Sequence, residues 1–167
     1  MRYHNITKDD MLNGVGLRVV LWVAGCSHCC KECHNPITWD PNGGLEFDAA
    51  AKQEIFEQLE QSYISGITFS GGEPFCQPEP LLKLAKEVHN LRKNVISYSG
   101  YTFEELLKLS EKNQGIKELM LNIDYLIDGK FILSEKTLML KFRGSKNQRI
   151  IDVKKSMQDG QAHIAEL

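Results

Sequence analysis

The chain has 167 residues, of which 42% are hydrophobic, and its net charge is −2. The length suits one domain over residues 1–167, and the composition excludes a disordered chain, a collagen or a coiled coil. The weakly acidic charge argues against a dedicated nucleic-acid-binding protein. The longest apolar run, residues 19–26, is too short to cross a membrane, and the N-terminus has no signal-peptide pattern, so we expect a cytoplasmic protein.

Segments typical of strands and helices alternate along the chain. The polar N-terminus up to Gly16 is interpreted as turns, and the segment from Cys26 to Gly44 as a long loop. Strands are predicted at residues 17–24, 67–70, 94–98, 125–128 and 137–142. Helices are predicted from Asp48 to about residue 63, from 78 to 91, and from Thr102 onward, where Glu105 completes a capping-box pattern. This alternation predicts a mainly parallel sheet with crossover helices, followed by a frayed tail after Ser156.

Four of the five cysteines fall within residues 26–33, where disulfides would be severely strained, so their crowding indicates a metal site. Cys26, Cys30 and Cys33 have the spacing C-x3-C-x2-C. Three thiolates can hold three irons of a [4Fe-4S] cube and leave the fourth iron open for a small molecule. A zinc site is the alternative, but four-cysteine zinc sites usually join pairs separated by about 15 residues or more. In the cluster interpretation Cys29 is an extra thiol that points away.

A glycine-rich motif follows the strand predicted at 67–70. Residues 70–74 read SGGEP, and paired glycines at the end of a strand let the backbone approach a ligand closely. The turn alone is a weak signal. Combined with the cysteine motif, it resembles the radical S-adenosylmethionine superfamily. The resemblance implies that the open iron binds the amino and carboxylate groups of S-adenosylmethionine, and that Gly71, Gly72 and Glu73 hold its methionine end.

A narrower resemblance rests on six sequence blocks. They are residues 13–18, 25–35, 70–74, 98–102, 127–131 and 143–149. Together they resemble the anaerobic (class III) ribonucleotide reductase activating proteins, and the last two blocks are the most specific. The resemblance implies an incomplete (β/α) barrel and an oxidoreductase that generates a glycyl radical on a flexible loop of the large reductase subunit. It also implies an external one-electron donor such as flavodoxin, and no general acid or base, because the cofactors carry the chemistry.

The resemblance implies further contacts with S-adenosylmethionine. Residues around the third cysteine, namely Glu32, Cys33 and His34, are expected near the adenine, and Ser99 is expected in the same site. Glu32 and His34 stand where the superfamily usually has aromatic residues. The residue that stacks on the adenine is therefore not defined by the motif.

Other residues have structural interpretations. His28 and His34 are expected to be solvated rather than metal ligands, and Cys76 to be a buried structural thiol. Arg18 lies in an apolar strand and should meet a carboxylate, either of the protein or of the cofactor. Asp128 either faces the mouth of the barrel or caps the glycine turn that follows it.

The segment from Lys141 to Lys155 contains six basic residues and one acidic residue. It is interpreted as a solvated surface, as a docking face for the reductase, or as a contact for nucleotide phosphate. No direct contact with nucleic acid or membrane is expected. Two competing functions stay open: an activator of another glycyl-radical enzyme, of the formate-lyase type, and a zinc-stabilised interaction module without catalysis.

Overall fold

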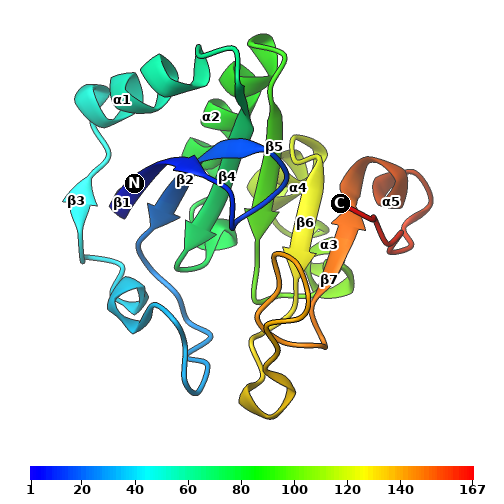
Figure 1. The fold of residues 1–167 in the computed structure, drawn as a ribbon. Coiled ribbons are helices and arrows are strands. Elements are labelled where there is room, and N and C mark those ends of the chain that lie inside the picture. The colour runs from blue at the N-terminus through cyan, green and yellow to red at the C-terminus, as the bar shows by residue number, and fades with distance from the viewer.

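The computed structural model describes residues 1–167 and contains one seven-stranded sheet with the strand order β3-β1-β2-β4-β5-β6-β7 (Figure 1). The central strands are parallel: β2 (Leu17–Val23), β4 (Ile64–Gly71), β5 (Asn94–Tyr98) and β6 (Tyr125–Asp128). The outer strands are antiparallel to their neighbours: β1 (Arg2–Asp10), β3 (Leu45–Glu46) and β7 (Arg149–Asp152). The predicted α/β class with a mainly parallel sheet is confirmed.

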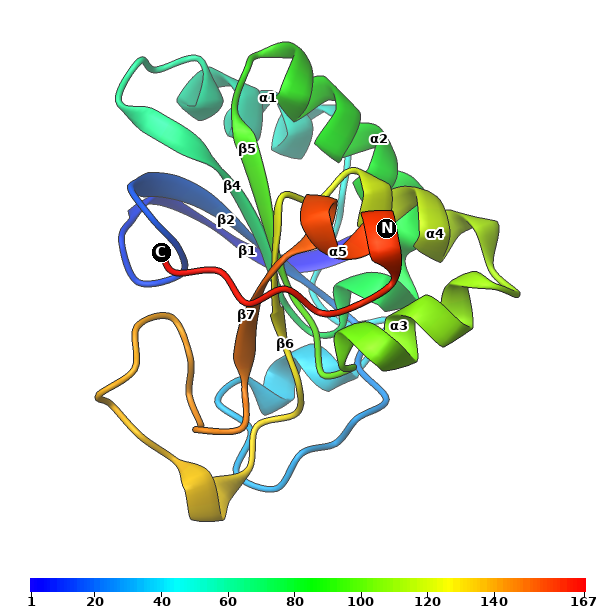
Figure 2. The same cartoon turned by 90° about the vertical axis from the view of Figure 1, so that its right-hand side faces the viewer.

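Five helices lie together on one side of the sheet, the right-hand side of Figure 2. They are α1 (Ala49–Leu59), α2 (Pro78–Asn90), α3 (Phe103–Ser110), α4 (Gln114–Leu121) and α5 (Val153–Asp159). Three 3₁₀ turns lie in the connections: η1 (Pro36–Trp39), η2 (Pro74–Cys76) and η3 (Leu133–Glu135). No helix is both long and apolar enough to cross a lipid bilayer.

The two faces of the sheet bury different side chains because residues alternate along each strand. Val19 and Leu21 of β2 belong to the large core under the helices. Ile96, Ile127 and Ile150 form a second, smaller cluster. These isoleucines alternate with the strand residues of the large core and therefore lie on the face that has no helices.

The predicted helix starts are confirmed by their caps. The Asp48 carboxylate accepts a hydrogen bond from the Ala51 backbone N–H at 2.9 Å and begins α1. Thr102 and Glu105 form both hydrogen bonds of the capping box at the start of α3. Pro78 begins α2, where its missing N–H costs no helical hydrogen bond.

The prediction of a strand at residues 137–142 is wrong. These residues form bends and turns, and the residues Leu138 and Met139 are 92% and 89% exposed. Their apolar character does not reflect packing against a sheet. The last strand is β7 instead, and it pairs antiparallel with β6 through Ile150 and Ile151, opposite Ile127 and Leu126.

The N-terminal interpretation also needs correction, because residues 2–10 form β1 and not turns. Tyr3 is the only residue of this strand that is buried, so an alternating apolar pattern is absent. The sequence pattern predicts one helix from Thr102 onward and does not separate α4 from α3. The tail after Ser156, predicted to be frayed, runs beside β7, where the Asp152 and Ala165 backbone N–H groups donate to the His163 and Ile150 carbonyls at 2.8 Å.

Candidate functional site

Four loops meet at the edge of the sheet where the parallel strands end, at the bottom of Figure 1. They enclose a cavity of about 160 Å³, here called the cysteine cavity. The loops follow β2, β4, β5 and β6 in turn, so each central strand contributes one wall. The lining of the cysteine cavity includes Cys26, His28, Cys30, Cys33, His34, Asn35, Gly71, Gly72, Tyr98, Ser99, Gly100, Lys130, Phe131 and Gln148.

The cysteine-bearing loop is closed at its base by backbone hydrogen bonds. The Gly25 N–H donates to the Thr38 carbonyl at 2.7 Å, and the Cys26 N–H donates to the Trp39 carbonyl at 3.1 Å. The loop is thereby held beside the end of β2. Within it, Cys29 adopts a positive φ of 47° and is exposed outside the cavity lining.

Burial changes the acidity of two of the cavity thiols. Desolvation raises the pKa of Cys26 to about 11, although the backbone N–H of His28 opposes this rise. Desolvation also raises the pKa of Cys30, and the neighbouring Cys33 adds to it, while the Phe131 backbone N–H and the Lys130 charge act in the opposite direction. Both thiols are therefore protonated at neutral pH when no cation is near. Metal binding to them must release protons.

The thiols of Cys26, Cys30 and Cys33 line the same cavity. In a [4Fe-4S] cube each thiolate binds a different iron, so three thiols around one cavity suit that group.

The paired glycines after β4 pack against the protein's own backbone. A Cβ atom at Gly72 would lie 2.4 Å from the Gly25 carbonyl oxygen and 3.0 Å from that of Thr38. A Cβ atom at Gly71, whose φ is +97°, would lie 2.6 Å from the Val23 nitrogen. The close contacts in this structure join the turn to the base of the cysteine loop and to β2, while a close approach to a ligand stays a prediction.

Glu73 is fully buried and binds several protein groups. Its carboxylate accepts hydrogen bonds from the backbone N–H of Phe75 at 3.0 Å and of Gly100 at 2.8 Å. The Ser99 hydroxyl donates to it at 3.0 Å, and the Nε2 atom of His28 lies 2.8 Å from it. Glu73 thus connects the turns after β4 and β5 with the cysteine loop.

The two histidines of the cysteine loop differ from one another. The prediction of a solvated side chain is wrong for His28, which is only 6% exposed. Its ring packs edge-on against Tyr101 with centroids 4.4 Å apart, because Gly100 leaves room for it. His34 is exposed, and its ring lies 4.9 Å from that of Phe131.

The predicted cofactor contacts are only partly brought together. Cys33, His34, Gly71, Gly72 and Ser99 line the cysteine cavity. Glu32, which is exposed at φ 57°, and the buried Glu73 do not line it.

Sequence reasoning missed the lining residues of the loop between β6 and β7. Lys130, Phe131 and Gln148 all line the cysteine cavity. The Gln148 side chain donates to the Gly129 carbonyl at 2.9 Å, and the Asn147 side chain donates to the Lys130 carbonyl at 2.8 Å. The block 143–149 therefore holds the block 127–131 against the cavity. Both blocks were singled out by the family resemblance, which was the available signal.

The structure also shows where Arg18, Cys76 and Asp128 lie, and each differs from its prediction. Arg18 is buried without a carboxylate partner, since its guanidinium donates to the Thr68 hydroxyl at 2.8 Å and to the Ile67 carbonyl at 2.7 Å. Burial lowers the pKa of Arg18 to about 10. Cys76 is exposed, so its prediction as a buried thiol is wrong. Asp128 accepts from the Phe103 N–H at 2.8 Å and is buried outside the cavity lining.

The basic segment is not one continuous face. Lys141, Arg143 and Lys146 belong to the loop beside the cysteine cavity, whereas Lys154 and Lys155 lie on α5 at the other end of β7. Between them, the guanidinium of Arg149 binds the carboxylates of Glu104 and Asp128.

Comparison with known proteins assigns the class. Residues 12–151 match the family model described as a 4Fe-4S single cluster domain, so the cysteine cavity belongs to an iron–sulfur domain. The chain is similar to proteins named anaerobic ribonucleoside-triphosphate reductase-activating protein in three organisms. It is 35% identical to that of Enterobacteria phage T4 over 90% of this chain and 93% of the relative. It is 36% identical to that of Haemophilus influenzae (90% and 97% covered) and 36% identical to that of Escherichia coli (89% and 96%). The chain belongs to the family of anaerobic ribonucleoside-triphosphate reductase-activating proteins.

Proposed function

We propose that this protein activates an anaerobic ribonucleoside-triphosphate reductase by generating a glycyl radical on its large subunit. The observation that carries the proposal is that Cys26, Cys30 and Cys33 line one cavity, in a chain whose relatives are named for this activation. In this proposal Cys26, Cys30 and Cys33 hold three irons of the cluster, and Cys29 remains free.

When bound, the cofactors would supply the radical chemistry: with one electron from an external donor such as flavodoxin, S-adenosylmethionine would yield methionine and a 5′-deoxyadenosyl radical. Transfer of a hydrogen atom from a reductase glycine to that radical would leave 5′-deoxyadenosine and a glycyl radical. The residues of the cysteine cavity bind and orient. Gly71, Gly72 and Ser99 are the proposed contacts of S-adenosylmethionine, together with His34 beside the third cysteine.

Glu73 has a positioning role in this proposal. Its carboxylate already accepts hydrogen bonds from Ser99, Gly100 and Phe75, which keeps the turn after β5 beside the cysteine loop. A radical acts on whatever lies next to it, so the distances between cluster, cofactor and target must be set beforehand. In this proposal the buried Glu73 side chain sets one of them from outside the cavity lining.

The open sheet has a consequence for the partner. We regard it as an incomplete (β/α) barrel in a cytoplasmic protein, with helices on one face and only loops and the tail on the other. A flexible glycine-bearing loop of the reductase would complete the site on that open side. The loop of residues 129–148 lies beside the cysteine cavity and carries Lys141, Arg143 and Lys146.

The test is activation of the reductase in a defined mixture. The protein is reconstituted with iron and sulfide under anaerobic conditions, reduced, and mixed with S-adenosylmethionine and the anaerobic reductase. We expect a doublet glycyl-radical signal by electron paramagnetic resonance and the formation of 5′-deoxyadenosine. If a formate-lyase-type enzyme acquires the radical while the reductase does not, the assignment moves to an activator of that other class.

A further inference from the structure

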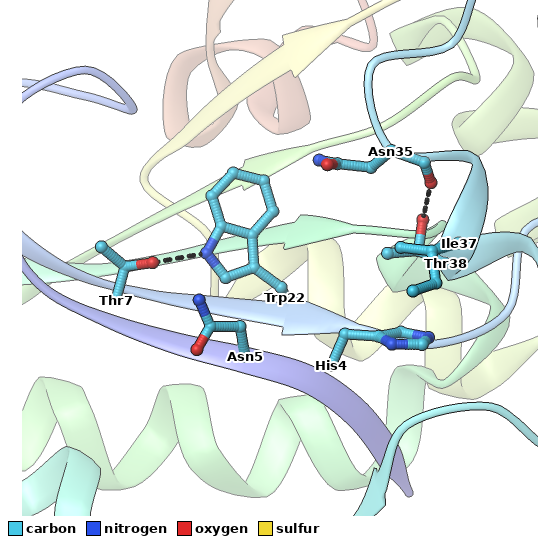
Figure 3. A pocket seen from close by; sticks show the side chains of 7 residues that line it. All are labelled: His4, Asn5, Thr7, Trp22, Asn35, Ile37 and Thr38. Atoms are coloured by element: carbon cyan, nitrogen blue, oxygen red, sulfur yellow. Dashed lines mark hydrogen bonds between the residues drawn. The ribbon is translucent and has the colours of Figure 1, made fainter.

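A second cavity lies beside the cysteine cavity, on the face of the sheet that has no helices. Figure 3 shows its lining: Asn5 and Thr7 come from β1, Trp22 comes from β2, and Asn35 and Ile37 come from the cysteine loop. Its volume is about 430 Å³, within the range of cavities that hold a ligand of drug size or a few residues of peptide. We call it the Trp22 cavity.

The free polar groups of this cavity are two carboxamides and the buried Nε2 atom of His4, which has no hydrogen-bond partner. The Trp22 indole N–H donates to the Thr7 hydroxyl at 2.8 Å, so the ring offers only its apolar surface to a ligand. The Asn5 Oδ1 atom accepts the Ile6 N–H at 2.9 Å, which leaves its NH₂ group available. The Asn35 backbone carbonyl accepts from Thr38, while its side chain lies toward Trp22 without a protein partner. A free carboxamide offers one donor face and one acceptor face, as a peptide group does.

The lining also excludes some ligands. No Asp, Glu, Lys or Arg lines the Trp22 cavity, and His4 is its only ionisable residue. S-adenosylmethionine carries a carboxylate, an ammonium and a sulfonium group, and burying such charges without partners is costly. An uncharged ligand with amide groups suits this cavity better.

Asn35 connects the two cavities because it lines both of them. A ligand that fills the Trp22 cavity therefore reaches the wall of the cysteine cavity without crossing a strand. A chain segment entering from the open side of the sheet can pass over Trp22 and present its next residue to the cofactors.

We propose that the Trp22 cavity binds the extended, uncharged backbone segment of the reductase that carries the target glycine. This inference rests on the proposed function. A glycine has no side chain to recognise, so its position must be set by contacts with the peptide groups around it. Asn5 and Asn35 supply those contacts, and Trp22 supplies the apolar floor.

The test uses the reconstituted protein with the intact reductase and two substitutions in the cavity. Asn5→Tyr fills the cavity, and Asn5→Leu removes the carboxamide while keeping a similar size. Asn90→Tyr makes the same change at an exposed position of α2 and is the matched control. Three quantities are measured: iron and sulfide content, 5′-deoxyadenosine formed with a chemical reductant in the absence of the reductase, and the rate of glycyl-radical formation at subsaturating reductase.

We expect both Asn5 variants to keep their cluster and their reductase-independent cleavage of S-adenosylmethionine. Glycyl-radical formation should fall about tenfold in Asn5→Tyr and severalfold in Asn5→Leu, and stay at the wild-type rate in Asn90→Tyr. Wild-type rates in both Asn5 variants would overturn the inference and leave the proposed function standing. A parallel loss of reductase-independent cleavage would also overturn it, because the cavity would then serve the cofactor. Failure of the proposed function is distinguished by the wild-type protein itself giving no glycyl radical.

Discussion

The Nε2 atom of His28 lies 2.8 Å from a carboxylate oxygen of Glu73, and both side chains are almost completely shielded from solvent. His28 belongs to the cysteine loop, while Glu73 follows β4. The same carboxylate binds the Ser99 hydroxyl and the Gly100 N–H after β5. One buried acid therefore connects the loop that carries the proposed cluster ligands to two turns of the sheet.

Replacing Glu73 should destabilise the fold at this connection. Glu73→Ala removes the acceptor of the buried Phe75 N–H and of the partly buried Gly100 N–H, so we expect a loss of about 2–4 kcal/mol in the free energy of unfolding. Glu73→Gln keeps the side-chain volume and retains one acceptor oxygen, so its loss of unfolding free energy should be smaller. Urea unfolding followed by tryptophan fluorescence measures both.

Glu60→Ala is the control for this series, because Glu60 is exposed at the end of α1. Its free energy of unfolding should stay within about 0.5 kcal/mol of the wild type. A Glu73→Ala protein as stable as the control would show that the carboxylate does not hold these turns together.

The turn after β4 predicts a second destabilising change. A Cβ atom at Gly72 would approach the Gly25 carbonyl oxygen to 2.4 Å, and neither backbone can move without opening the base of the cysteine loop. Gly72→Ala should therefore lower the unfolding free energy by about 2 kcal/mol or more and impair cluster retention.

Gly115→Ala provides the comparison. Gly115 lies in the first turn of α4, where an added Cβ would meet side-chain atoms of Glu79 and Asn113 and no backbone atom closer than these. Because these side chains can move and alanine has a higher helix propensity than glycine, this variant should lose less stability than Gly72→Ala. Equal losses in the two variants would contradict the close-approach argument at Gly72.

The sequence allowed the central strands to be predicted because they are buried on both faces. Residues 17–23 and 94–98 are mostly apolar or β-branched, and each ends at a polar or glycine turn. The strand β1 lacks this pattern because only Tyr3 is buried. Around Leu138 a strand is predicted from apolar residues that are in fact exposed on a loop. Hydrophobicity reports burial only where a tertiary partner exists.

The cavity was predictable where its residues are neighbours in sequence. Cys26, Cys30 and Cys33 lie close together along the chain, so their spacing alone indicates a shared site. Phe131 and Gln148 reach the same cavity only because a long loop folds back between β6 and β7. Contacts of that kind depend on the tertiary path of the chain, which local patterns do not specify.

The third prediction concerns the cysteines. If Cys26, Cys30 and Cys33 are the ligands, substitution of any one by alanine should prevent stable [4Fe-4S] formation. Cys29→Ala and Cys76→Ala should keep the cluster, because both residues are exposed outside the cavity lining. Iron and sulfide analysis after anaerobic reconstitution measures this. A full cluster in Cys30→Ala, or its loss in Cys29→Ala alone, would refute the ligand assignment.

The fourth prediction concerns the ion pair between Arg149 of β7 and Glu104 of α3. The guanidinium donates to both carboxylate oxygens, at 3.1 and 2.7 Å, and these hydrogen bonds hold the pKa of Glu104 below its ordinary value. The folded protein therefore keeps Glu104 ionised to a lower pH than the unfolded chain does. The stabilisation is complete above the ordinary pKa of glutamate, about 4.3, and is lost as the pH falls through the lowered folded value.

Glu104→Gln should therefore be less stable than the wild type at neutral pH and approach it at acidic pH. Because the Glu104 side chain is 57% exposed, solvent screens the pair, and the neutral-pH difference should be about 0.2–1 kcal/mol. Urea unfolding at a series of pH values from about 7 down to about 3 measures it, with Glu111→Gln as an exposed control. A difference that stays constant across this range would mean that the stability change comes from packing of the new side chain and not from the charge of Glu104.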